Sequence, residues 1–206
     1  MHPERFNALT HFIGSALALA GTVVLIALAT MAGDPWRVAS VSIYGATLVL
    51  LYSFSALYHH HSLGGRTKDI LRKLDHHSIY LLIAGSYTPF CLVTLRGPWG
   101  WSLFGIERGL AALGSWQDMR PRNGRRILSV AIYLVMGWMA LLALVPLLQA
   151  LGSAGFARLV AGGLVYTVGV VFFALDGRFR YAHSVWHLFV MAGSATHYVA
   201  ILHYVL

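Results

Sequence analysis

Charged residues and cysteine are both scarce in this chain. Charged side chains make up 11% of its 206 residues and hydrophobic ones 58%, whereas a soluble domain has about 25% charged and about 45–50% apolar residues. The single cysteine, Cys91, excludes an internal disulfide and a zinc site built from thiolates. We expect it to be a small buried apolar residue. Low charge and long apolar runs together predict an integral membrane protein.

Seven segments of the chain reach or approach the length of a transmembrane helix, which needs about 20 apolar residues. The fourth segment is the weakest, because Glu107 and Arg108 interrupt it. We therefore predict one all-α domain, residues 1–206, that forms a bundle of seven transmembrane helices. The predicted spans cover approximately residues 8–30, 38–58, 78–95, 99–116, 127–148, 156–175 and 184–205.

The breaks between these segments carry glycine and proline, the residues typical of turns. They lie at residues 33–35, 64–65, 97–98, 121–124, 152 and 176–177. The first apolar run follows a short, weakly basic start and is too long for the apolar part of a signal peptide. We expect it to remain as a membrane anchor.

Basic residues are distributed unevenly between the predicted loops. With seven spans, eleven of the 15 lysines and arginines lie on the side of the N-terminus and three lie on the other, with Arg108 inside the fourth span. The positive-inside rule then places the N-terminus in the cytoplasm and the C-terminus outside. This topology also explains the net charge of +8, so we expect membrane lipids and no nucleic acid as partners. The eleven are Arg5, Arg66, Lys68, Arg72, Lys73, Arg120, Arg122, Arg125, Arg126, Arg178 and Arg180.

His183 and His187 stand four residues apart at the start of the last apolar run. On a helix this spacing places both imidazoles on one face. Imidazole is a common metal ligand, and a polar pair that faces a membrane interior is costly without a partner. The spacing therefore asks for a third group that completes a site.

Two other spans bring candidate groups to the same membrane level. His59 lies at the cytoplasmic end of span two and Asp75 just before the cytoplasmic end of span three. A catalytic zinc commonly has three protein ligands and an open position for water, so His59, His183 and His187 are the predicted ligands. Asp75 is the candidate general base. Ser55, one helical turn from His59, is placed to hydrogen-bond the water or a ligand.

Each of these residues also has a simpler interpretation. His60 and His61 compete with His59, although a solvated histidine cluster at a helix end accounts for them. Asp75 could be the N-cap of span three. The histidine pair itself could be interfacial, held by water or lipid headgroups.

Four further polar residues have open roles. Glu4 and Asn7 fit helix capping as well as support of the site. His11 is one turn deeper than Asn7 and is not predicted as a ligand. His197 lies about 15 Å deeper than His187 along a helix, so an interhelical hydrogen bond is the favoured interpretation.

Five short stretches resemble the hemolysin III family of bacterial membrane proteins. That family is the prokaryotic branch of the progestin and adipoQ receptors, which include the adiponectin receptors. The resemblance covers essentially the whole chain and departs from the pattern at Glu107-Arg108. The stretches are Glu4–Asn7 with Thr10-His11, Ser55–His59, Leu74–His76, Gly85–Pro89 and His183–His187.

The resemblance implies a seven-helix fold in the bacterial cytoplasmic membrane with a cytoplasm-side zinc. It implies His59, His183 and His187 as the ligands, with Asp75 and Ser55 around the bound water. The wider group includes alkaline ceramidases, so it implies a zinc-dependent hydrolase of a lipid or acyl-amide bond. Two alternatives are a non-catalytic membrane receptor or regulator with structural zinc, and a pore-forming cytolysin.

Overall fold

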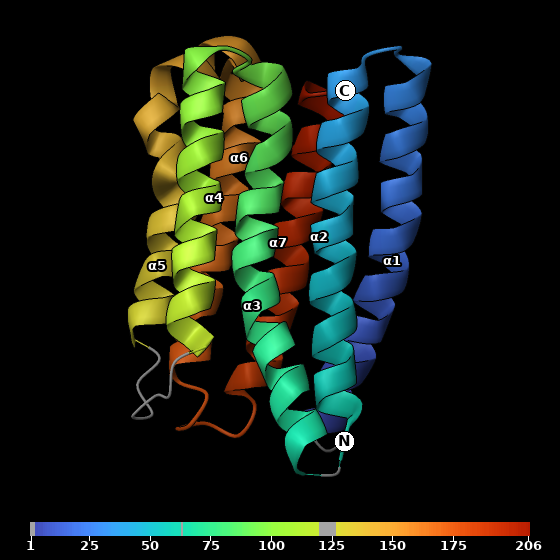
Figure 1. The fold of residues 1–206 in the computed structure, drawn as a ribbon, viewed down its shortest axis with the longest axis vertical. Coiled ribbons are helices and arrows are strands. Elements are labelled where there is room, and N and C mark those ends of the chain that lie inside the picture. The colour runs from blue at the N-terminus through green and yellow to red at the C-terminus, as the bar shows by residue number, and fades with distance from the viewer. Residues whose placement is uncertain (1–2, 63, 120–126) are drawn as a thin grey trace.

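Long helices make up the fold. The computed structural model describes residues 3–62, 64–119 and 127–206, and none of these residues forms a β-strand. This confirms the all-α class. The helices lie side by side along the long axis, and the two termini lie at opposite ends of the bundle (Figure 1). The elements are α1 Pro3–Met31, α2 Pro35–His60, α3 Arg66–Pro89, the π-helix η1 Phe90–Thr94, α4 Pro98–Met119, α5 Ile127–Trp138, the 3₁₀-helix η2 Met139–Ala143, α6 Leu144–Ala174 and α7 Ala182–Tyr204.

Glycines with positive φ occupy four of the predicted turns. Gly33, Gly65, Gly97 and Gly152 have φ values of 71°, 88°, 139° and 67°, a region that glycine enters without steric cost. At Gly152 the backbone leaves the helical region within α6. The predicted turn at residues 121–124, and Arg120, Arg122, Arg125 and Arg126 beside it, lie outside the described residues.

Among the described residues, four helical stretches are long and apolar enough to cross a membrane. They are Pro3–Met31, Pro35–His60, Ile127–Ala174 and Ala182–Tyr204. The third is 48 residues long and contains the break at Gly152. The helical parts before and after Gly152 lie side by side. A hydrogen bond joins them, from the Trp138 indole N–H to Thr167 Oγ1 at 3.0 Å. These candidate spans indicate a membrane protein that crosses the membrane several times. The number of seven spans stays a prediction.

The third predicted span, residues 78–95, is the apolar part of a longer helical segment. α3 begins at Arg66, and the π-helix η1 follows Pro89 with a hydrogen bond from Leu95 N to Phe90 O. Hydropathy does not reveal the polar first half of α3. Because α3 begins at Arg66, Asp75 lies inside this helix. The interpretation of Asp75 as an N-cap is therefore wrong.

The two charged residues in α4 diverge, as neighbours on a helix do. Arg108 donates to Thr88 Oγ1 at 2.7 Å and lies over the Phe104 ring. Glu107 is fully buried, and its carboxylate oxygens have no hydrogen-bond partner among the described residues. Cys91 is 1% exposed, as expected of a small buried residue.

Helix α7 packs against α1, α2 and α6 through hydrogen bonds as well as apolar contacts. Ser184 donates to Asn7 Oδ1 at 2.6 Å, and Tyr198 donates to the Gly21 carbonyl at 3.1 Å. The bond to Asn7 holds the first turn of α7 beside the first turns of α1, and the bond to Gly21 joins the same two helices further along. The end of α2 lies at the same end of the bundle (Figure 1), and this places the candidate site.

Candidate metal centre

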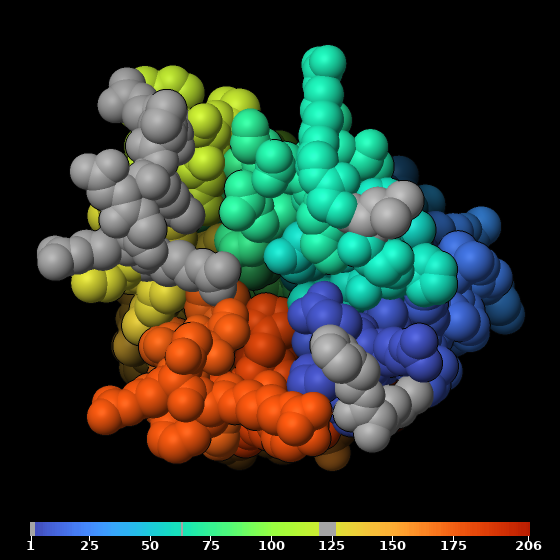
Figure 2. All heavy atoms as spheres, turned by 90° about the horizontal axis from the view of Figure 1, so that it is seen from below, coloured from blue at the N-terminus to red at the C-terminus, as the bar shows by residue number. Residues whose placement is uncertain are grey.

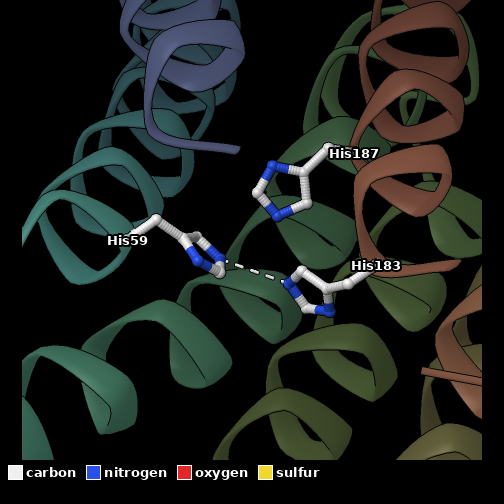
Figure 3. A group of neighbouring side chains, drawn as sticks. All are labelled: His59, His183 and His187. Carbon is white, nitrogen blue, oxygen red and sulfur yellow. Dashed lines mark hydrogen bonds between the residues drawn. The ribbon is translucent and has the colours of Figure 1, made fainter. Parts of the chain in front are cut away.

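Three histidines from two helices lie close together (Figure 3), where α2 ends and α7 begins. His59 lies in the last turn of α2, and His183 and His187 lie in the first two turns of α7. One candidate ligand nitrogen from each lies within 4.8 Å of the others. These are the three predicted ligands, and in this arrangement they could hold one metal ion.

The spacing of the ring nitrogens suits a shared ion. His59 Nε2 and His183 Nε2 lie 3.2 Å apart. Two nitrogens bound tetrahedrally to one zinc, at Zn–N distances of about 2.0–2.1 Å, lie about 3.3 Å from each other. The two rings are therefore already separated as a tetrahedral ion requires.

A carboxylate stands behind each of these two rings. Glu4 Oε2 lies 3.1 Å from His59 Nδ1, and Asp176 Oδ2 lies 3.1 Å from His183 Nδ1. A carboxylate accepts a hydrogen bond from Nδ1–H and thereby fixes the tautomer that leaves Nε2 unprotonated. In that tautomer two nitrogen lone pairs face each other, and a cation between them is the arrangement that removes their repulsion.

Sequence reasoning left the role of Glu4 open and missed Asp176. In the structure the Glu4 carboxylate contacts the candidate ligand His59, so its role goes beyond helix capping. Asp176 was interpreted only as part of a turn, and its partner His183 is seven residues further along the chain. A carboxylate in the turn just before a histidine-bearing helix is the signal that points to it.

Ser55 and Asp75 line the cavity that the histidines face. Both are lining residues together with His183 and His187. Ser55 is buried at 2% exposure, and the side chain of Asp75 is 13% exposed. Neither belongs to the three-residue cluster, so the structure brings Ser55 and Asp75 to the cavity wall and not among the three candidate ligands.

The other histidines at this end play different parts. His60 is exposed and packs edge-on against Phe12, and His61 is the C-cap residue of α2; neither joins the cluster. His11 stacks on His187 with ring centroids 3.6 Å apart and an interplanar angle of 14°. His59 is therefore the member of the histidine run that meets α7.

A large cavity extends from the candidate centre into the bundle. It reaches from His11 and His183 to His197, and its volume of about 1010 Å³ includes space that is open to solvent. Seen from the end that carries the N-terminus, the surface is hollowed between α3 in green and the orange segment that includes the start of α7 (Figure 2). Most of the lining is apolar, which suits a lipid-like ligand.

Fold and site together define a helical membrane protein with a buried histidine cluster above an apolar cavity. The chain belongs to the haemolysin-III related family, whose model matches residues 1–198. It is 42% identical to Hemolysin-3 of Bacillus cereus, over 98% of this chain and 92% of that protein. It is 40% identical to the Hemolysin-3 homolog of Bacillus subtilis (strain 168), over 98% and 93%.

A mammalian relative also matches nearly the full chain. The human protein named Monocyte to macrophage differentiation factor is 32% identical, over 96% of this chain and 82% of its own length. The resemblance found in the sequence motifs is thereby confirmed for the family and for its wider superfamily.

Proposed function

We propose that this protein is a zinc-dependent hydrolase of the bacterial cytoplasmic membrane that cleaves a lipid or acyl-amide bond near the cytoplasmic leaflet. The observation that carries the proposal is the cluster of His59, His183 and His187, with ligand nitrogens within 4.8 Å of one another. Ser55 and Asp75 line the apolar cavity beside this cluster. A lipid substrate suits that cavity better than a polar metabolite does.

The three imidazoles would hold the zinc, which supplies an acidified water and polarises a carbonyl. The Asp75 carboxylate accepts the proton of the attacking water as the new carbon–oxygen bond forms. The same carboxyl group then delivers that proton to the leaving nitrogen as the carbon–nitrogen bond breaks. Ser55 orients the water or the carbonyl through a hydrogen bond from its hydroxyl group.

The proposed topology has seven spans, with the N-terminus in the cytoplasm. The predicted loops on the N-terminal side carry eleven basic residues against three. The two termini lie at opposite ends of the bundle (Figure 1), as an odd number of spans requires. This orientation sets the histidine cluster at the cytoplasmic leaflet.

Element analysis of the detergent-purified protein tests the metal. We expect about one zinc per chain, retained in His60→Ala and lost in His187→Ala. His60 is the matched control, because it is an exposed histidine one residue from the predicted ligand His59. Full zinc content in His187→Ala would contradict the proposed centre.

A screen of acyl-amide and ester lipids with the zinc-loaded protein tests the reaction. Asp75→Asn should bind zinc normally and lose about 10²–10⁴-fold in rate, the usual contribution of a general acid–base group. If the loaded protein hydrolyses none of these lipids, the regulator with structural zinc becomes the better interpretation.

The names of two relatives favour one other function. Both Bacillus proteins are named for hemolysis, so membrane lysis is the second candidate. It predicts leakage of dye from liposomes at the same rate for the unchanged protein and for His187→Ala. Leakage that is absent from both would remove this candidate.

A further inference from the structure

A second cavity lies beyond the first one, behind a shared wall. It lies among α3, η1, α5 and α6, and its volume of about 640 Å³ includes space that is open to solvent. The two cavities have six lining residues in common, so these residues form the partition between them. The six are Ser86, Tyr87, Gly137, Trp138, Gly163 and His197.

Trp138 is the largest side chain of this partition. Its indole N–H donates to Thr167 Oγ1 at 3.0 Å, so the ring bridges from α5 to α6. A Cβ built on Gly163 would lie 3.9 Å from the ring, which places the indole against the backbone of α6. The ring therefore stands between α5 and α6 at the boundary that the two cavities share.

Hydrogen bonds hold the neighbours of Trp138 in place. Tyr87 donates to the Gly137 carbonyl at 3.0 Å and accepts from Ala140 N at 2.9 Å, and so supplies partners where α5 changes to η2. His197 Nε2 lies 3.2 Å from the Leu159 carbonyl oxygen. The partition is thus tied to the backbone of α5 and α6 and is not a loose contact of side chains.

The partition lies at a definite depth below the candidate centre. His187 and His197 are ten residues apart on α7, which corresponds to about 15 Å along the helix axis. An extended acyl chain whose carbonyl end lies at the histidine cluster would run through the first cavity and meet Trp138. A longer chain requires the space behind the indole.

We propose that Trp138 determines the acyl-chain length that this protein accepts, because its indole closes the first cavity and separates it from the second. The ligand is a single-chain acyl lipid with its carbonyl end at the histidines and its methyl end against Trp138. This inference rests on the proposed function for the class of substrate. Chain selection, however, is measured by binding and needs no turnover.

An equimolar mixture of saturated fatty acids from octanoate to docosanoate is the probe. The purified full-length protein is incubated with the mixture in detergent and separated from unbound lipid, and the retained acids are measured by mass spectrometry. Trp138→Ala and Trp138→Leu each open the partition. Leu164→Ala is the matched control, since Leu164 is 51% exposed on the outer face of α6 next to Gly163.

In both Trp138 variants we expect the ratio of longer to shorter retained acids to rise about tenfold, the factor that corresponds to relief of overpacking by one or two methylenes. The control should keep the original distribution. An unchanged distribution in a folded Trp138 variant would overturn the inference. A shift in retained length, in a protein that hydrolyses no acyl lipid, would leave the inference standing and count against the proposed reaction alone.

Discussion

Single residues decide the chemical state of the candidate ligands. His59 and His183 present Nε2 to the centre because Glu4 and Asp176 occupy their Nδ1 atoms at 3.1 Å. His187 has a different environment, since its ring is covered by the stacked ring of His11. Two ligands are therefore oriented by charge and one by ring packing.

Removal of either carboxylate charge should weaken the metal while leaving the ligands in place. Glu4→Gln and Asp176→Asn each keep the size of the side chain and lose the strong acceptor. We expect metal affinity, measured by competition with a chelator, to fall about 10–100-fold in each variant. Asp69→Asn is the control, because that exposed carboxylate pairs with Arg72 at 3.2 Å, away from the histidine cluster. Equal affinities in all three variants would show that the carboxylates do not orient the rings.

The same residues show how far sequence reasoning reaches. The spacing of four between His183 and His187 predicts their shared face, since helical periodicity is local. The choice of His59 over His60 required the resemblance and the spacing to Ser55, and the structure brings His59 to α7. The contact of Asp176 with His183 was missed, because it depends on how the turn before α7 folds back.

At the scale of helices, the lengths of the apolar runs predicted the positions of most helices. They did not predict the irregular parts of these helices. The bounds of α2, α4 and α7 lie within three residues of the predicted spans at either end. The polar first half of α3, the π-helix η1 and the 3₁₀-helix η2 were not predicted. Each depends on tertiary contacts, such as the bonds from Tyr87 to the backbone around η2, which hydropathy does not register.

The start of α4 provides a test of close helix packing. A Cβ on Gly100 would lie against the carbonyl oxygens of Cys91 and Leu95, 2.6 Å from the latter. These are backbone atoms that cannot move aside, so we expect Gly100→Ala to lower the free energy of unfolding by about 1–3 kcal/mol. The measurement is the midpoint of thermal unfolding in detergent.

Gly105 in the same helix is the matched control for that substitution. Nothing lies within 4 Å of a Cβ built there, and alanine favours a helix interior over glycine by about 1 kcal/mol. Gly105→Ala should therefore raise the midpoint slightly or leave it unchanged. If both variants unfold at the same temperature, the contact between α4 and η1 is looser than the structure shows.

At the scale of the whole molecule, orientation decides which leaflet the site serves. The histidine cluster lies at the end of the bundle that carries the N-terminus, and the C-terminus lies at the opposite end (Figure 1). Loop charge indicates on which side of the membrane each end lies, whereas packing within the bundle does not, because it is the same in either orientation. A measurement of orientation therefore tests whether the substrate reaches the site from the cytoplasmic leaflet, as we propose.

The single cysteine makes that measurement direct. Cys91 is buried, so a cysteine introduced at an exposed turn is the site that a membrane-impermeant maleimide reaches. Ala32→Cys and Gly64→Cys lie in the turns at opposite ends of α2, and both positions are exposed. With the N-terminus in the cytoplasm, Ala32→Cys should label in intact cells and Gly64→Cys only after permeabilisation. The reverse pattern would move the histidine cluster to the outer leaflet, and a hydrolase there would draw its lipid from the other face of the membrane.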